Sequence, residues 1–207
     1  MEKHKVSIII PYKKDRGYLD QAIRSVELQT YGNVELIISQ SNNGVSYNLN
    51  RGIEQSTGDF IKYLCDDDML SRDSIEKSVK AFKPSTSFIH GNAIAFRELV
   101  SQGNVYRPIK KHLNLKNMLT TNYIHGGTLM YRKEVFKEVG MFNETLWTGE
   151  EYEFNLRCFA NGLKCTYTDE ILYYYRLHGE QKSIGNTSKL YQSMRKQQME
   201  IIRSWYR

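Results

Sequence analysis

The chain has 207 residues, which suits one domain with a substantial core and is short for two domains. Hydrophobic residues make up 40% and charged residues 25% of the sequence, as in folded globular proteins, which argues against a disordered chain. The formal net charge of +6 is compatible with anionic small ligands, nucleic acid or an acidic membrane surface, and does not choose among them.

The first half of the chain alternates strand and helix patterns. Residues 5–10, KVSIII, form an apolar, β-branched run closed by Pro11, which is typical of a buried parallel strand. A helix over 15–30 is predicted from the helical spacing of Leu19, Ile23 and Val26. The pattern then repeats, with strands at 34–39 and 59–65 around a helix at 45–56. This β-α-β-α-β order predicts a doubly wound α/β sheet.

Polar segments follow all three of these predicted strands. They are Pro11, Tyr12 and Lys13; Gln40, Ser41 and Asn42; and Asp66, Asp67 and Asp68. Ligands of doubly wound sheets bind beyond the carboxyl ends of the strands, so these segments should meet on one rim. We expect the functional site there.

The second half has less regular patterns. We expect a helix at 71–82 capped by Ser71, a strand at 86–96, and a basic loop or hairpin at 97–112. A strand at 126–132, helices at 133–140 and 149–162, and a long strand or bent pair at 164–178 follow. The tail spaces apolar residues along one helical face, namely Leu190, Met194, Ile201, Ile202 and Trp205. We divide the chain into a domain at 1–183 and a C-terminal amphipathic helix at 184–207. This helix packs on the domain, leads to a further domain, or contacts a membrane surface.

The cysteines and the N-terminus bear on the compartment. Cys65, Cys158 and Cys165 are odd in number and show no CxxC spacing, which argues against a disulfide framework and a zinc site. The segment before Pro11 has too few apolar residues for the core of a signal peptide, and no run approaches membrane-spanning length. We therefore expect a cytoplasmic protein.

Three consecutive carboxylates, Asp66, Asp67 and Asp68, end the apolar run FIKYLC. Like charges this close, partly desolvated at the mouth of a sheet, cost stability unless a positive partner is present. A basic patch or a solvated turn is the alternative, but the position at the end of a strand favours a metal site. Oxygen-only ligands suit Mg²⁺ or Mn²⁺, which commonly bridge substrate phosphates.

Five segments stand in the order seen in family 2 glycosyltransferases, and the chain resembles that family from Lys5 to about Ser183. They are VSIIIPYKKDRGYLDQAIRSVELQTYGNVELIISQSNNG, NRGIEQSTGDFIKYLCDDDML, GGTLMYRKEVFKEVGMFNE, GEEYEFNLR and YYYRLHGEQKS. The resemblance implies the GT-A fold, a Rossmann-like, doubly wound mixed sheet with helices on both faces. It also implies an enzyme that takes a sugar from a nucleotide diphosphate.

The resemblance places the nucleotide base on the loop after the first strand and the end of the second. Here these segments are Pro11, Tyr12 and Lys13 with Gln40, Ser41 and Asn42. Gln40 stands where the family has an aspartate that binds the uracil N–H, and its amide can accept from N3–H and donate to O4. Asn50 begins the family's Asn-x-Gly. The arginine that often precedes it is Leu49 here, so Arg51 or another cation would supply that phosphate contact.

The three carboxylates resemble the family's DxD signature. On that basis Asp66 belongs to the metal site and contacts the ribose or metal-bound water. Asp68 is the direct ligand of Mn²⁺ or Mg²⁺, and Asp67 is able to replace either. The resemblance implies His178 as a further metal ligand or diphosphate contact, with a structural histidine as the alternative. Arg176, Lys182 and Ser183 are further candidates to hold the diphosphate.

The resemblance also assigns the remaining site residues. Glu151 matches the family's usual catalytic aspartate, with Glu150 beside it, and stabilisation of the helix dipole is their alternative role. Gly126 and Gly127 would let the backbone approach the donor sugar or would simply begin a strand. Trp147 would be an apolar platform for the acceptor sugar or a core residue.

Together these features predict an inverting, metal-dependent transfer of a hexose from a UDP-sugar, or a dTDP-sugar, to a hydroxyl of a glycan acceptor. A nucleotidyltransferase is the nearest enzymatic alternative, although the Gly-rich loop typical of that class is replaced by PYKKDRGY. A non-catalytic nucleotide- or glycan-binding module is the other alternative. We expect no nucleic-acid partner, because only the net charge points to one.

Overall fold

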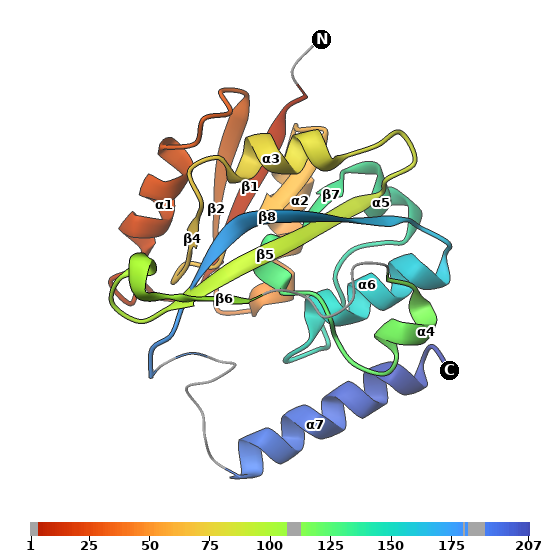
Figure 1. Cartoon of the computed structure of the whole chain (residues 1–207). Helices are drawn as coiled ribbons and strands as arrows, with labels where there is room; N and C mark the ends of the chain where they lie inside the picture. Colours follow the sequence, from red (N-terminus) through yellow and green to blue (C-terminus); the bar gives the residue numbers. More distant parts are fainter. Residues whose placement is uncertain (1–3, 107–112, 180, 182–188) are drawn as a thin grey trace.

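The computed structural model describes residues 4–106, 113–179, 181 and 189–207. Over these residues, eight strands form one mixed sheet in the order β2-β1-β3-β7-β5-β8-β4, with β6 paired to β5 (Figure 1). The strands are β1 (Val6–Tyr12), β2 (Val34–Gln40), β3 (Phe60–Tyr63), β4 (Met69–Leu70), β5 (Phe88–Phe96), β6 (Asn104–Tyr106), β7 (Met130–Arg132) and β8 (Cys165–Arg176).

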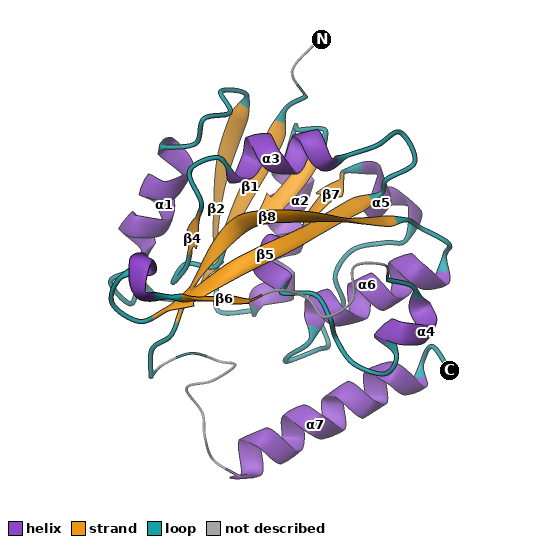
Figure 2. Ribbon diagram, in the orientation of Figure 1, coloured by secondary structure: helices purple, strands orange, loops and turns teal. Residues whose placement is uncertain are grey.

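Helices cover both faces of this sheet (Figure 2). They are α1 (Leu19–Glu27), α2 (Val45–Gln55), α3 (Ser74–Ala81), α4 (Leu115–Met118), α5 (Glu134–Glu138), α6 (Glu150–Ala160) and α7 (Lys189–Ser204), with the 3-10 turns η1 (Val100–Gln102) and η2 (Gly126–Thr128). Apolar residues of α1 and α3 join the core on one face, and those of α2, α5 and α6 join the core on the other.

The parallel half of the sheet follows from the apolar run at the N-terminus. β1 lies between β2 and β3 and is parallel to both, so the predicted β-α-β-α-β start is confirmed. Val6, Ile8 and Ile10 pack into the core beneath α1 and α3, whereas Ile9 points into the opposite core. Because both faces of β1 are buried, the strand is nearly continuous in apolar residues.

Beyond β3 the sheet becomes mixed. β7 is antiparallel to β3 and to β5, while β5 and β8 run parallel. The register of β5 and β8 shifts between His90 and Ala93, and β8 continues through this irregularity as one strand. β4 comes directly after the three aspartates and pairs antiparallel with β8, which brings the aspartates close to the end of β8. The predicted doubly wound mixed sheet is confirmed.

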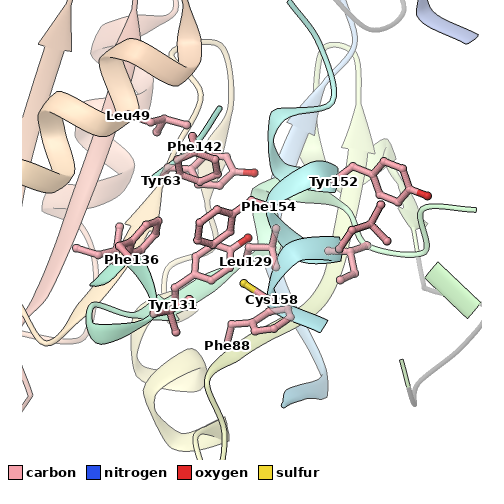
Figure 3. Close-up of a cluster of buried hydrophobic side chains, with 14 of the residues drawn as sticks. Leu49, Tyr63, Phe88, Leu129, Tyr131, Phe136, Phe142, Tyr152, Phe154 and Cys158 are labelled. Carbon is pink, nitrogen blue, oxygen red and sulfur yellow. The ribbon is translucent and has the colours of Figure 1, made fainter. Parts of the chain in front are cut away.

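An aromatic cluster fixes α6 on the sheet (Figure 3). The ring of Phe154 in α6 lies 4.9 Å from Phe136 of α5, 4.7 Å from Phe142 and 5.2 Å from Tyr131 of β7. These side chains are all buried. The start of α6, where the two candidate bases stand, is thereby held on a rigid part of the core.

The C-terminal helix α7 packs on the domain through only part of the predicted apolar set. Ile202 is fully buried, whereas Met194, Ile201 and Trp205 are 48%, 49% and 48% exposed. The prediction that these residues share one contact face is therefore wrong for the described side chains. A helix turns about 100° per residue, so adjacent Ile201 and Ile202 lie on different sides of it.

Local features also differ from expectation. Ser71 does not cap α3, whose N-cap residue is Asp73; its hydroxyl donates instead to the carbonyl oxygen of Ile171 at 2.7 Å. The beginning of the strand predicted at 126–132 is the turn η2, and the stretch predicted as irregular from residue 97 contains η1 and β6. Residues 107–112, Lys182, Ser183 and the boundary at 183/184 lie outside the described residues. Within those described, no helix combines the length and apolar character needed to cross a bilayer.

Candidate active site

The carboxyl ends of β1, β2 and β3 lie side by side, as their parallel order requires. Tyr12 pairs with Gln40 in register, and the Ser41 N–H donates to the Tyr12 carbonyl oxygen at 3.3 Å. Pro11 is buried at this rim, whereas Lys13, Gln40 and Asn42 are exposed. The segments predicted to hold a nucleotide base thus form one continuous edge.

Asn48, a buried residue of α2, ties this edge together. Its side-chain N–H groups donate to the carbonyl oxygens of Tyr12 at 3.1 Å and Ser41 at 3.2 Å. Its amide oxygen accepts from the Ser41 hydroxyl at 2.6 Å. Because the Asn48 amide makes hydrogen bonds to the ends of both β1 and β2, α2 sets the relative position of these two ends.

Asp68 is the inward-facing member of the three aspartates and is 3% exposed. Its Oδ1 accepts the Arg176 backbone N–H at 2.7 Å, and its Oδ2 accepts the Tyr173 hydroxyl at 2.9 Å. Burial, reinforced by the neighbouring charge of Asp67, raises the pKa of Asp68 despite these hydrogen bonds. The carboxylate is anchored to β8 by donors at both oxygens.

Asp66 and Asp67 face a different set of partners. Nη2 of Arg16 lies 2.9 Å from Asp66 Oδ1 and 2.9 Å from Asp67 Oδ2. The same oxygen of Asp67 lies 3.1 Å from Nε2 of His178. The sequence grouped His178 with Asp66 and Asp68 as metal ligands, but the carboxylate that His178 contacts is Asp67. Burial raises the pKa of Asp66, while Arg16 opposes that shift.

A divalent cation fits this end of β3. Ligand atoms of Cys65, Asp67 and Asp68 all lie within 4.8 Å of one another, and both carboxylates are buried. Carboxylate oxygens are the hard ligands that Mg²⁺ and Mn²⁺ prefer. A cation among them would favour the charged form of Asp68, which burial disfavours. The two carboxylates therefore suit a hard cation, with Asp66 and His178 at the border of the site. Cys65 is a soft donor, and burial raises the pKa of its thiol, which disfavours the thiolate that would bind a metal.

Arg176 braces the loop that carries the aspartates. Its Nε donates to the Asp67 carbonyl oxygen at 3.0 Å, and its Nη2 donates to Gln21 at 2.8 Å. The guanidinium lies 4.7 Å from the ring centroid of Tyr18 and 4.8 Å from that of Phe96. Since this cation is packed and only 7% exposed, we now expect Arg176 to position the loop rather than to contact a diphosphate directly.

The candidate bases stand in the first turn of α6. Gly149 precedes the helix with a φ of 79°, in the left-handed region that glycine tolerates. A Cβ added to Gly126 would lie 2.9 Å from Cγ of Glu151 and 2.7 Å from the Tyr63 hydroxyl. The turn η2 and the first turn of α6 are thus in contact, which brings together two predicted site segments 25 residues apart in the sequence. Glu150 shares the first turn with Glu151.

Tyr173 links η2 to the aspartates. A Cβ on Gly127 would lie 2.3 Å from its ring, so only glycine fits there, while the Tyr173 hydroxyl donates to Asp68 and accepts the Cys65 N–H at 3.1 Å. The buried ammonium of Lys62 donates to the carbonyl oxygens of Gly127 and, at 3.0 Å, Leu129. Burial lowers the pKa of Lys62 to about 7.

The Asn50 side chain makes hydrogen bonds to the segment that precedes α6. Its amide N–H donates to the Phe142 carbonyl oxygen at 3.0 Å and to Glu144 at 2.7 Å, and its amide oxygen accepts the Phe142 N–H at 3.0 Å. We now expect Asn50 to hold the segment that leads to α6 instead of contacting the donor. Trp147 is half-buried in that same segment.

The structure adds site residues that the sequence did not indicate. They are Arg16, Asn48, Lys62 and Tyr173. The only local signal was the cation in KKDRGY for Arg16 and a charged residue inside an apolar strand for Lys62. Asn48 and Tyr173 carried no local signal, because their partners stand 7 to 36 and 105 to 108 residues away in the sequence.

Comparisons with known proteins identify the family and the fold. The family model described as glycosyl transferase family 2 matches residues 36–140. An uncharacterized glycosyltransferase of Rickettsia conorii is 29% identical over 219 residues, which cover 87% of this chain and 36% of the relative. The chain therefore spans about a third of that relative's length.

Solved structures share the fold at low sequence identity. Staphylococcus aureus TarS 1-349 in complex with UDP-GlcNAc superposes with a TM-score of 0.68 at 16% identity, over 84% of this chain and 59% of that one. The mannosyltransferase PcManGT from Pyrobaculum calidifontis, in complex with GDP-Man and Mn²⁺, gives a TM-score of 0.64 at 12% identity, over 83% and 56% of the two chains. From the match to the family model and the shared fold, the chain belongs to glycosyl transferase family 2 and has the GT-A fold.

Proposed function

We propose that this chain transfers a hexose from a UDP-sugar to a hydroxyl group of a glycan acceptor, with inversion at the anomeric carbon and with help from a divalent cation. The observation that carries the proposal is the convergence of three segments. The edge at Tyr12 and Gln40 lies beside the end of β3, because β1 pairs with both β2 and β3. The carboxylates after β3 are linked to the first turn of α6 through Tyr173 and the turn η2.

The donor nucleotide is proposed to bind at the edge formed by β1 and β2. Gln40 offers both a donor and an acceptor to the imide edge of a pyrimidine, and the other segments of the edge are Pro11, Tyr12, Lys13, Ser41 and Asn42. TarS has been solved with UDP-GlcNAc, which supports a uridine nucleotide here. A dTDP-sugar presents the same imide edge and stays as the alternative donor.

Asp67, Asp68 and His178 are the residues that we propose to hold Mn²⁺ or Mg²⁺, with Asp66 toward the ribose. The bound ion would neutralise the charge that develops on the leaving diphosphate. PcManGT, a neighbour in fold, has been solved with Mn²⁺. The chain's own groups orient these carboxylates. The Tyr173 hydroxyl and the Arg176 backbone N–H orient Asp68 and favour its charged form, against the burial that disfavours it.

Glu151 is proposed as the base, with Glu150 as the alternative. In the transfer step the carboxylate takes the proton of the acceptor hydroxyl, whose oxygen forms a bond to the anomeric carbon. The bond between that carbon and the diphosphate oxygen breaks, and UDP leaves with the electron pair. Attack opposite the leaving group inverts the anomeric configuration. Gly126 is proposed to let the backbone pass close to the sugar, and Trp147 is proposed to meet the acceptor. Gly127 is explained by its packing against the Tyr173 ring.

The first experiment is a panel of UDP- and dTDP-sugars incubated without acceptor in Mn²⁺, Mg²⁺ or EDTA. We expect nucleoside diphosphate to be released from one donor, with release lost in EDTA and in Asp67→Ala. If no donor is hydrolysed, and calorimetry finds no metal-linked binding of UDP, the donor-site proposal fails. The sugar that is hydrolysed identifies the donor.

The base is tested separately, in the presence of acceptor. Glu151→Gln should lower transfer by at least about 100-fold and leave the affinity for UDP unchanged, because general-base catalysis contributes roughly 10²–10⁴-fold. Glu150→Gln should lower transfer less. A larger loss in Glu150→Gln would exchange the two roles, and full activity in both variants would remove the base assignment.

The rival functions give different products. A nucleotidyltransferase would release pyrophosphate from a nucleoside triphosphate and a sugar phosphate, whereas a binding module would hold UDP without turnover.

We also propose, as an extension from the sequence, that the exposed apolar residues of α7 contact a membrane surface or an adjacent domain and that the protein acts in the cytoplasm.

A further inference from the structure

Arg16 reaches the carboxylates from the loop between β1 and α1. A single guanidinium nitrogen, Nη2, bridges Asp66 Oδ1 and Asp67 Oδ2 at 2.9 Å each. The side chain of Arg16 is 26% exposed, and those of the two aspartates are 13% and 12% exposed. This bridge is therefore a partly desolvated, charge-assisted contact and differs from a surface ion pair.

The loop around Arg16 is held on both sides. Before the arginine, the Asp15 carboxylate accepts the Gly17 N–H at 2.8 Å, and Gly17 has a φ of 83°, in the left-handed region. After it, the ring of Tyr18 packs against the guanidinium of Arg176 and lies 5.0 Å from the ring of His178. The turn D-R-G thus keeps Arg16 next to the carboxylates.

The Nη2 nitrogen of Arg16 contacts a carboxylate that is also a proposed metal ligand. Asp67 Oδ2 receives both Arg16 and His178, and the two oxygens of Asp68 receive Tyr173 and the Arg176 backbone. A metal ion held by Asp67 would meet the positive charge of Arg16 on the same carboxylate. An arginine keeps its charge at any pH at which proteins fold, so this competitor cannot be removed by deprotonation.

We propose that Arg16 is a resident cation that competes with the divalent metal for Asp66 and Asp67, and that a nucleoside diphosphate relieves the competition by offering Arg16 its phosphate oxygens. Metal and nucleotide then bind cooperatively, and Arg16 is the source of that coupling. The inference rests on the proposed donor site but concerns binding and not turnover. By linkage, the metal and the nucleotide raise each other's affinity by the same factor.

The test is titration of Mn²⁺ into the whole chain, alone and with saturating UDP, in the wild type and in Arg16→Gln. Without UDP, the variant should bind Mn²⁺ about 5- to 10-fold more tightly, since a single opposing charge near the site has gone. In the wild type UDP should tighten Mn²⁺ binding strongly, and in Arg16→Gln this gain should shrink by a similar factor. Calorimetry or the paramagnetic resonance signal of unbound Mn²⁺ gives both affinities.

Lys14→Gln is the matched control, because it removes the same charge from an exposed position two residues away in the same loop. It should leave the Mn²⁺ affinity close to that of the wild type. Arg16→Lys keeps the charge and should keep the competition. If Arg16→Gln binds Mn²⁺ alone no more tightly than Lys14→Gln does, Arg16 does not compete and the inference falls, while the donor site stands. If no variant binds Mn²⁺ with or without UDP, the metal site of the proposed function falls as well.

Discussion

Asp67 and Asp68 are neighbours in the sequence, but their side chains contact different groups. Both oxygens of Asp68 accept hydrogen bonds from β8, whereas Asp67 faces Arg16 and His178. We expect Asp68→Asn to destabilise the protein by about 1–3 kcal/mol, because an amide offers one acceptor oxygen and turns an N–H group toward a second donor. Asp67→Asn should instead weaken Mn²⁺ binding in the presence of UDP by at least about tenfold. Its loss of stability should be the smaller of the two, because Arg16 keeps its contact with Asp66.

Chemical denaturation and Mn²⁺ titration of the same two variants separate these effects. Equal losses of stability would mean that Asp67 is also a structural carboxylate. A larger loss of metal binding in a folded Asp68→Asn would make Asp68, and not Asp67, the more important of the two proposed ligands, as the DxD resemblance implied.

Gly126 offers a way to move Glu151 without changing its chemistry. A Cβ at Gly126 would come within 2.9 Å of Glu151 Cγ and 2.7 Å of the Tyr63 hydroxyl. Glu151 is a flexible side chain that is able to yield, so we expect Gly126→Ala to fold while displacing the carboxylate. A misplacement of about 1 Å costs roughly 100-fold in rate, and transfer should fall on that scale with UDP affinity unchanged.

Gly32→Ala is the control for this substitution, since a Cβ there meets open space. Rates and melting temperatures of both variants decide the outcome. Wild-type transfer in Gly126→Ala would show that the contact with Glu151 does not affect the reaction.

At the scale of elements, α7 closes over the start of α6. A Cβ at Gly149 would lie 2.4 Å from Cε of Met199 and 3.1 Å from Cδ1 of Ile202, so the two helices touch where α6 begins. The Tyr206 hydroxyl donates to Glu153, and Nε of Arg203 donates to the Tyr152 hydroxyl at 3.1 Å. The helix end that carries the candidate bases is therefore held partly by the last helix of the chain.

Two adjacent isoleucines of α7, buried Ile202 and exposed Ile201, allow this packing to be tested. Ile202→Ala removes about 2–5 kcal/mol of local packing and should lower kcat while leaving the UDP affinity unchanged. Ile201→Ala, the same substitution on the exposed side of α7, should change neither, and Ile202→Val should restore most of the rate. A fall in melting temperature with unchanged kcat in folded Ile202→Ala would reduce α7 to a stabilising role.

Most elements could be predicted from hydrophobic periodicity, because their core faces are local in sequence. The rim at the ends of β1, β2 and β3 followed from the parallel order alone. The insertion of β7 between β3 and β5 is different, since a short strand carries no mark of its partners. The contact face of α7 was missed for a similar reason: apolar residues occur on more than one side of the helix, and only the packing at Gly149 selects the side of Ile202.

The candidate site, too, could be predicted only where the signal lies within one segment of the sequence. The carboxylates could be selected as candidates because a run of charge at a strand end is unusual. Their individual contacts could not be predicted, because these depend on donors from the β1–α1 loop and β8. Arg16 stands 50 and 51 residues from the aspartates that it bridges, and Tyr173 stands 105 from Asp68. No pattern within one segment predicts such pairs.

At the scale of the whole molecule, Lys62 is a charge in the middle of the sheet. It is fully buried, its partners are carbonyl oxygens, and burial lowers its pKa from 10.5 to about 7. Between these two values the unfolded chain holds a proton that the folded chain lacks. The free energy of unfolding should therefore rise with pH over this window, by at most about 1.4 kcal/mol per pH unit from this group. Below about pH 7 both states are protonated, and the cost of the buried charge is fully present.

Lys62→Met removes the titrating group with little change in length, and the difference between the two proteins isolates its contribution from those of other buried groups. Urea unfolding at several pH values between about 7 and 10 should give a wild-type curve that gains stability relative to Lys62→Met as the pH rises. Lys80→Met is the control, because Lys80 is 73% exposed and its charge is in water in both states. Parallel curves for wild type and Lys62→Met would mean that Lys62 keeps its proton in the folded protein, with the carbonyl oxygens of Gly127 and Leu129 offsetting its desolvation.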